Sequence, residues 1–116
     1  MTLPLSEPEM QRGIIEQARW LGFRVHHDRP AQTSRGWRTP IEGDAGFPDL
    51  VLALDGYVLA WELKTRRGKV SDEQAAWGEA MTGRNGVAVV EYGVIRPDQY
   101  DDALAALDRI AHAMRR

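Results

Sequence analysis

Two carboxylates and a lysine stand at the ends of two short apolar runs. Asp49 comes directly before the run Leu50–Leu54. Glu62 follows the run Tyr57–Trp61, and Lys64 comes two residues later. Carboxylate oxygens are ligands of Mg²⁺, and an ammonium group beside them can stabilise negative charge that develops on a reacting phosphate. These side chains therefore have the types needed for metal-dependent phosphate chemistry, provided that the fold brings them together.

The dipeptide Asp55-Gly56 between the two runs accepts the positive φ angles of a two-residue β-hairpin. In such a hairpin Leu54 pairs with Tyr57, and counting outward places Asp49 opposite Glu62. Directly opposed residues have Cβ atoms about 4.5–5.5 Å apart, and two full charges at that distance repel by about 3 kcal/mol at an effective dielectric of 20. A divalent cation would offset this repulsion, and the strand period of two puts the lysine on the same face.

The same charges also fit an ion cluster at a sheet edge, in which Lys64 simply neutralises Glu62. Against this interpretation, both faces of the strand that ends at Glu62 are largely apolar, as in a strand covered by helices on both sides. Charges at the end of such a strand are costly unless they are paired or bound to metal, and groups perturbed in this way gather at functional sites.

A set of short motifs follows in a fixed order over most of the chain. It comprises Ser6-Glu7, Gly46-Phe47-Pro48-Asp49-Leu50, Glu62-Leu63-Lys64, Gly68, Gln74, Trp77 and Arg96-Pro97. This set resembles the virus-type replication-repair nuclease (VRR-NUC) domain of the PD-(D/E)xK nuclease superfamily. Ile95 stands where the family pattern has an aromatic residue, a departure that concerns packing. The resemblance implies an α/β, restriction-endonuclease-like fold with an αβββαβ core, whose mixed sheet of about four strands is flanked by helices.

The resemblance further implies a metal-dependent endonuclease that hydrolyses DNA phosphodiester bonds with Mg²⁺ or Mn²⁺ as cofactor. Asp49, Glu62 and the backbone carbonyl of Leu63 would hold the metal, and Glu7 would recruit a second ion through water. Lys64 would orient the attacking water or stabilise the developing negative charge.

Two helical residues complete the candidate catalytic set, and each has a second interpretation. Glu7 falls near the centre of the buried stripe of the first helix, although a carboxylate in a first turn is also favoured by the helix dipole. Gln74 lies against the catalytic site in the resembled family, where it would position substrate or a water molecule. It also stands three residues after Ser71, so it fits a capping box.

Positive charge gathers in two segments, although the chain as a whole has a net charge of -2. The candidate nucleic-acid-binding residues are Arg29, Arg35, Trp37, Arg38, Arg66, Arg67 and Lys69. The basic side chains could meet phosphates and Trp37 could stack on an unpaired base. Ordinary solvated charges and a flexible flap with a hydrophobic pin explain the same pattern. His26 and His27 are assigned to a strand, because no third ligand stands at a metal-site spacing.

The remaining elements follow from periodicity and capping signals. A capping box at Ser6 begins a helix that ends at Gly22, and residues 23–27 form a strand. Residues 28–46 have no clear periodicity. A second capping box at Ser71 opens a helix to about Thr82 that Asn85-Gly86 ends. A strand over 87–91 and a last helix from Pro97-Asp98 follow, and the strand on each side of the second helix predicts a right-handed parallel crossover.

Residues 1–116 have the length of one domain. The chain has no cysteine, no apolar run long enough to span a bilayer and no secretory signal, so we expect a cytoplasmic protein of a bacterial or phage-infected cell without a membrane partner.

The resemblance points to branched DNA, such as four-way junctions, in phage or prophage replication and repair. A homodimer is expected, because one chain offers one active site and symmetrical cutting of two strands needs two. Two alternatives stay open: a nuclease of the same chemistry in restriction or in packaging of phage DNA, and a non-catalytic nucleic-acid-binding module in which the acidic pair is structural.

Overall fold

The computed structural model describes residues 3–28, 31–33, 36–38, 42–84 and 88–115. Its main sheet has four strands in the order β1-β4-β5-β6. These strands are β1 (Arg24–His27), β4 (Leu50–Leu54), β5 (Tyr57–Leu63) and β6 (Glu91–Ile95). The β1–β4 and β4–β5 pairs are antiparallel and the β5–β6 pair is parallel. The predicted mixed sheet and the αβββαβ order of the core are confirmed.

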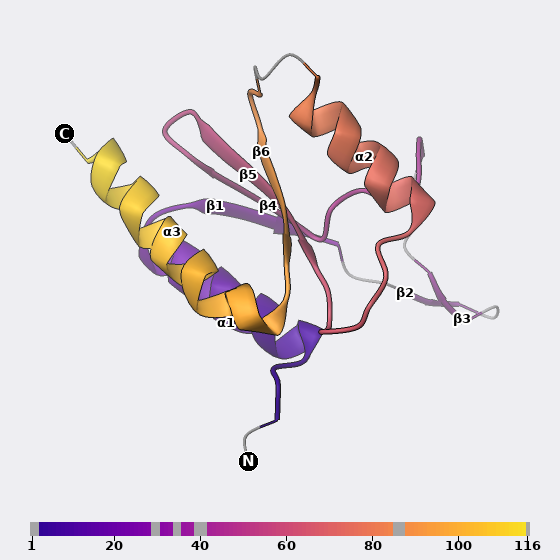
Figure 1. Ribbon diagram of the computed structural model, residues 1–116. Coiled ribbons are helices and arrows are strands. Elements are labelled where there is room, and N and C mark those ends of the chain that lie inside the picture. The colour runs from indigo at the N-terminus through magenta and orange to yellow at the C-terminus, as the bar shows by residue number, and fades with distance from the viewer. Residues whose placement is uncertain (1–2, 29–30, 34–35, 39–41, 85–87, 116) are drawn as a thin grey trace.

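Helices cover both faces of this sheet (Figure 1). α1 (Glu7–Trp20) and α3 (Tyr100–Met114) pack side by side against one face, while α2 (Asp72–Thr82) lies over the other. A 3-10 turn, η1 (Pro97–Gln99), leads from β6 into α3. Within the described ranges, none of these helices combines the length and the apolar character that crossing a membrane requires.

The hydrophobic core lies between the sheet and the α1–α3 pair. Its main buried side chains are Met10, Ile14 and Ala18 from α1, Leu50 and Leu52 from β4, Leu59, Trp61 and Leu63 from β5, and Ala103, Leu107, Ile110 and Ala111 from α3. Alternate residues of β4 and β5 therefore face α1 and α3, and the residues between them face α2. The strand period thus decides which side chains reach each helical layer.

The β4–β5 hairpin has the predicted turn. Asp55 and Gly56 have φ angles of +48° and +88°, as a two-residue turn with two left-handed residues requires. The register pairs Leu54 with Tyr57 at the turn and Leu50 with Trp61 at the far end. The next pair outward is Asp49 and Glu62, so the predicted opposition of the two acids is confirmed.

The last strand of the sheet was predicted too early in the chain. The structure places β6 at Glu91–Ile95 rather than 87–91, and the C-cap of α2 is Gly83, with φ +75°, rather than Asn85-Gly86. Residues 85–87 lie outside the described ranges. Gly93, which interrupts the apolar pattern, pairs with Trp61, and a Cβ atom on it would lie 3.4 Å from Trp61 Cδ1. Gly93 therefore lies within the strand, and a side chain at this position would contact the indole of Trp61 at an ordinary van der Waals distance.

The segment 28–46, predicted to be without regular structure, contains a second small sheet. It is an antiparallel pair formed by β2 (Ala31–Thr33) and β3 (Gly36–Arg38). Strands of three residues are too short to give an alternation that sequence reading can detect.

Candidate active site

Asp49 and Glu62 meet on the face of the sheet that α2 covers. They stand opposite each other at the end of the β4–β5 ladder, one position beyond the Leu50–Trp61 pair. Because Leu50 and Trp61 belong to the core beneath α1 and α3, the strand period turns their neighbours to the other face. Glu62 is the buried charged residue of the described chain, with 1% of its surface exposed.

A proline shapes the backbone beside this pair. The Leu63 N–H points toward β4 and donates to Asp49 Oδ2 at 2.8 Å. In an extended residue the C=O points to the same side as the N–H, so the Leu63 carbonyl also faces β4. Its partner in the ladder would be Pro48, which has no N–H to donate. Pro48 therefore ends the ladder, and the Leu63 carbonyl faces the same side as the N–H that binds Asp49.

Glu62 has one satisfied and one orphaned oxygen. Gln74 Nε2 donates to Glu62 Oε1 at 3.1 Å, whereas Oε2 is buried and has no hydrogen-bond partner in the described part of the chain. Burial and the nearby carboxyl group of Asp49 raise the pKa of the Glu62 carboxyl to about 8, with a smaller contribution from the negative charge of Glu7, and the Lys64 ammonium opposes this shift. Without a cation, the fold therefore favours a protonated Glu62.

The donors at this point fit a small hard cation. Asp49, the orphaned Oε2 of Glu62 and the Leu63 carbonyl offer oxygen ligands, and Mg²⁺ is commonly bound by one or two carboxylates and keeps several waters. A bound cation would supply the partner that Oε2 lacks. Among the described residues, no three histidine, cysteine or acidic side chains gather closely enough to hold a metal ion. The candidate site thus rests on two acids and a backbone oxygen.

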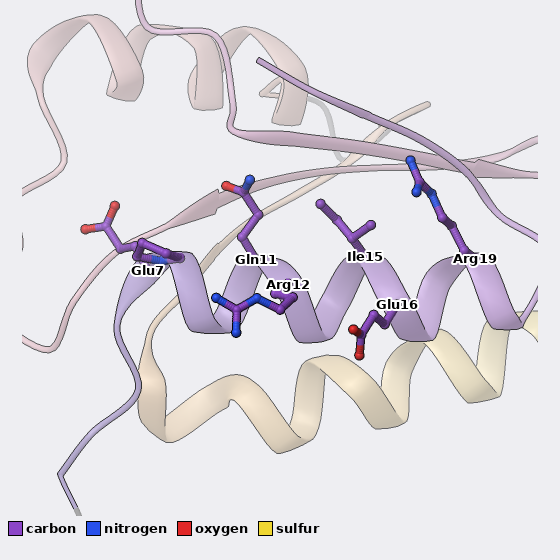
Figure 2. A pocket seen from close by; sticks show the side chains of 7 residues that line it. Glu7, Gln11, Arg12, Ile15, Glu16 and Arg19 are labelled. Atoms are coloured by element: carbon purple, nitrogen blue, oxygen red, sulfur yellow. The ribbon is translucent and has the colours of Figure 1, made fainter. Parts of the chain in front are cut away.

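Glu7 approaches this site without joining the acidic pair in a three-residue cluster. It lies in the first turn of α1, half-buried, and its charge contributes to the raised pKa of Glu62. Figure 2 shows Glu7 at one end of a row with Gln11, Ile15 and Arg19 along α1. These residues help to line a groove of about 560 Å³ on α1. A role for Glu7 in recruiting a second ion through water stays a prediction.

Gln74 has the capping role predicted for it and also contacts Glu62, whereas its role in positioning substrate or a water molecule stays a prediction. The side-chain Oε1 of Gln74 accepts from the backbone N–H of Ser71 at 2.9 Å, and the backbone N–H of Gln74 donates to Ser71 Oγ at 3.1 Å. These two bonds complete the capping box of α2. Gln74 Nε2 is then left to donate to Glu62. The cap therefore orients the amide, and the start of α2 becomes a fixed support for the buried carboxylate.

The loop before Asp49 is fastened to the same helix. Gly46 has φ +93°, and a Cβ atom on it would lie 2.5 Å from the backbone carbon of Glu73. Only glycine allows so close an approach. Further along α2, Trp77 Nε1 donates to the Asp44 carbonyl at 3.3 Å, and its ring meets Phe47 edge to face with centroids 5.0 Å apart. These contacts hold Asp49 in register with Glu62.

Lys64 follows the last residue of β5 and is half-buried. Its positive charge lowers the pKa of Glu62, as expected if the strand period puts both side chains on one face. The aliphatic part of its side chain lies beside Gly68. The turn that follows carries the exposed basic residues Arg66, Arg67 and Lys69. Arg29 and Arg35 lie outside the described residues, as do the side chains of Trp37 and Arg38, so their predicted contacts with nucleic acid remain predictions.

Arg96 organises this basic turn, a role that its place in the motif order did not disclose. Its guanidinium donates to the Thr65 carbonyl at 2.8 Å, to that of Gly68 at 2.8 Å and to that of Arg66 at 3.4 Å. A lone arginine after a strand gives no sequence signal for capping a turn about 30 residues earlier. Tyr92 was also missed: burial and the charges of Glu62 and Asp49 raise the pKa of its phenol.

We expect Arg96→Gln to loosen the 65–68 turn. A hydrogen bond from a charged donor contributes about 1.5–3 kcal/mol. We expect the free energy of unfolding of the variant to fall by about that amount in total. Trypsin should cut the native variant faster at Arg66 and Arg67, as followed by mass spectrometry. Arg115→Gln, an exposed change near the end of α3, should leave both unchanged. Equal protection of the turn in Arg96→Gln and the parent would contradict the role given to this guanidinium.

The two histidines of β1 belong to the strand, as predicted. His26 Nε2 lies 3.2 Å from Asp28 Oδ1, and His27 Nδ1 lies 3.2 Å from Gln11 Nε2 on α1. Neither contributes to a three-residue metal cluster within the described ranges.

Comparison with protein families and with curated proteins gave no match. Comparison with solved structures gave a match to a chain described as a VRR_NUC domain, with a TM-score of 0.58 and 25% sequence identity. The match covers 85% of this chain and 94% of the other. The chain has the VRR-NUC fold. The VRR-NUC resemblance drawn from the order of motifs is thereby confirmed at the level of the fold, and it suggests a nuclease.

Proposed function

We propose that this protein is a metal-dependent endonuclease that hydrolyses DNA phosphodiester bonds. The observation that supports this most directly is the orphaned Oε2 of Glu62, buried beside Asp49 in a VRR-NUC fold. A buried polar atom without a partner is costly, and a cation bound between the acids would remove that cost. The same atoms would be hard to explain in a purely structural ion pair.

Each residue of the candidate site would have a separate role in hydrolysis. When bound, Mg²⁺ or Mn²⁺ would neutralise charge on the scissile phosphate and lower the pKa of a water molecule. Asp49, Glu62 and the Leu63 carbonyl would hold the cation. Gln74 would fix the orientation of Glu62, and Lys64 would orient the attacking water or stabilise the charge that develops on the phosphate. Glu7 would act through water near the same place.

DNA would meet this site over the basic turn. Arg66, Arg67 and Lys69 project into solvent directly after Lys64, where they can contact phosphates on either side of the cleaved bond. Arg29, Arg35, Trp37 and Arg38 would extend this surface. The overall charge of -2 means that binding depends on this local patch rather than on the field of the whole protein.

We further propose that the substrate is branched DNA, such as a four-way junction, and that a homodimer supplies the two active sites that paired cuts require. The resembled family supports a role in phage or prophage replication and repair. A panel of substrates tests this choice: a four-way junction, a flap and a linear duplex, each with Mg²⁺ and with Mn²⁺, with the oligomeric state measured by light scattering.

The matched control in that panel is Asp49→Asn. Its amide oxygen can still accept from the Leu63 N–H, so the variant removes charge while keeping the structural bond. The proposal predicts faster cutting of branched DNA by the parent and no cutting by the variant. Equal cutting of linear duplex would favour a restriction or packaging role, and binding without cleavage in either metal would indicate a non-catalytic module.

A further inference from the structure

An open pocket of about 430 Å³ lies beside Trp77, between α2 and residues 44–45. It is lined by Asp44, Ala45, Glu73, Ala76, Trp77 and Ala80; we call it the indole pocket. Three of its six lining residues are alanines, so small side chains keep the space open next to a large aromatic surface. The indole itself is held in place by its hydrogen bond to the Asp44 carbonyl and by its edge contact with Phe47.

Two segments connect the indole pocket to the candidate metal site. Phe47, which contacts the indole, is two residues before Asp49, a span of at most about 7 Å between Cα atoms. Glu73, which lines the pocket, precedes Gln74, the residue that donates to Glu62. A strand of DNA whose phosphate lies at the acids therefore has the indole pocket within reach of an adjacent nucleotide.

We propose that the indole pocket binds one unpaired nucleobase of the DNA substrate, next to the cleaved phosphodiester. This inference rests on the nuclease function proposed above. The base would stack against Trp77, and because the indole is already held at two points, little conformational entropy is lost when the base enters. Base stacking on an aromatic side chain accepts any of the four bases.

The charges around the pocket favour a base over a phosphate. Asp44 and Glu73 place two carboxylates among the lining residues, and these would repel the sugar–phosphate backbone. Carboxylates do accept hydrogen bonds from the amino groups of bases, as acidic side chains do from cytosine N4. The apolar and acidic side chains that line the pocket thus complement a base that has left its helix. Such bases occur in single-stranded flaps and at junctions whose central pairs have opened, and not in intact duplex.

The test combines altered DNA with altered protein. A flap or junction that the parent cleaves is prepared as a series, in which a stable abasic residue replaces each nucleotide near the cut in turn. We expect one position where removal of the base lowers kcat/KM by about tenfold or more, in line with the contribution of one stacked base. At that position Ala80→Leu, which fills the pocket from the exposed face of α2, should cut the intact and abasic substrates equally slowly.

A second variant and a control protect this test from effects on folding. Trp77→Leu should show the same loss of sensitivity to the abasic residue, and circular dichroism reports whether it folds. Trp20→Leu removes a tryptophan that is 85% exposed at the end of α1, and it should keep the parent's sensitivity. If Ala80→Leu also keeps that sensitivity, the pocket does not bind a base. If the parent cleaves no flap, junction or duplex from which such a series could be built, the nuclease function itself is refuted.

Discussion

A Glu62→Gln variant is expected to unfold at a higher temperature than the parent at pH 8.5 in the absence of metal, and to lose Mn²⁺ binding. Glutamine has nearly the shape of a protonated glutamic acid, and its amide group can donate to Asp49 where the parent needs a proton. The substitution therefore removes a buried charge that the metal-free fold disfavours. The variant should gain stability and lose function together.

The direction of the pH dependence follows from the raised pKa. In the folded protein the pKa of Glu62 is about 8, whereas in the unfolded chain it returns to the ordinary value of about 4.3. Between these values the folded state binds the extra proton, so stability falls as pH rises through this window. The contribution of Glu62 to the free energy of unfolding is fully present below the pKa of the unfolded chain. It is lost as the pH rises above the pKa of the folded protein. Each unit of pKa difference corresponds to about 1.4 kcal/mol.

Thermal melts of metal-free protein from pH 5 to pH 9 would measure this. The difference in Tm between Glu62→Gln and the parent should widen as pH rises, and Mn²⁺ should raise the Tm of the parent alone. Glu79→Gln, an exposed change on α2, provides the matched control and should reproduce the parent's slope. A constant Tm difference across this range would show that Glu62 does not titrate as the geometry requires.

Lys64→Ala is expected to lower the rate of DNA cleavage at saturating Mn²⁺ by at least about 10²–10³-fold, with folding and DNA binding nearly intact. The positive charge of Lys64 acts on the acidic pair, since it lowers the pKa of Glu62 against the effect of burial. Because Lys64 also opposes the rise in that pKa, its loss will weaken metal binding at neutral pH. Single-turnover rates should therefore be compared at pH 8.5 or above, with metal in excess.

Two further variants distinguish a positive charge that acts in catalysis from one that only contributes to DNA binding. Lys69→Ala removes an exposed charge from the same turn and should raise KM and reduce the salt dependence, with kcat nearly unchanged. Arg84→Ala, exposed after the end of α2, should change neither. Turnover retained by Lys64→Ala would remove the lysine from the mechanism.

The acidic pair could be located from the sequence because short-range rules determine it. A two-residue turn at Asp55-Gly56 fixes the register of the hairpin, and register alone puts Asp49 opposite Glu62 on one face. The capping boxes at Ser6 and Ser71 are equally local, and both helices begin where these motifs predict.

Features that depend on tertiary contacts were beyond the same reasoning. β6 begins four residues later than predicted, because its bounds follow from parallel pairing with β5, about 30 positions earlier in the chain, and not from the apolar run alone. The hydrogen bonds from the Arg96 guanidinium to the 65–68 turn join residues about 30 positions apart in the chain. That Gln74 caps α2 and supports Glu62 at once is visible only when both partners are in place.

We propose that Asp49 and Glu62 chelate one divalent cation together with the Leu63 carbonyl. Crystals soaked in Mn²⁺ at pH 8.5 and measured for anomalous scattering test it most directly. We expect a single strong peak within about 2.5 Å of an oxygen of each acid and of the Leu63 carbonyl. Crystals of Asp49→Asn should lack that peak. A parent crystal with no peak between the two acids, or with manganese bound only elsewhere, would contradict it.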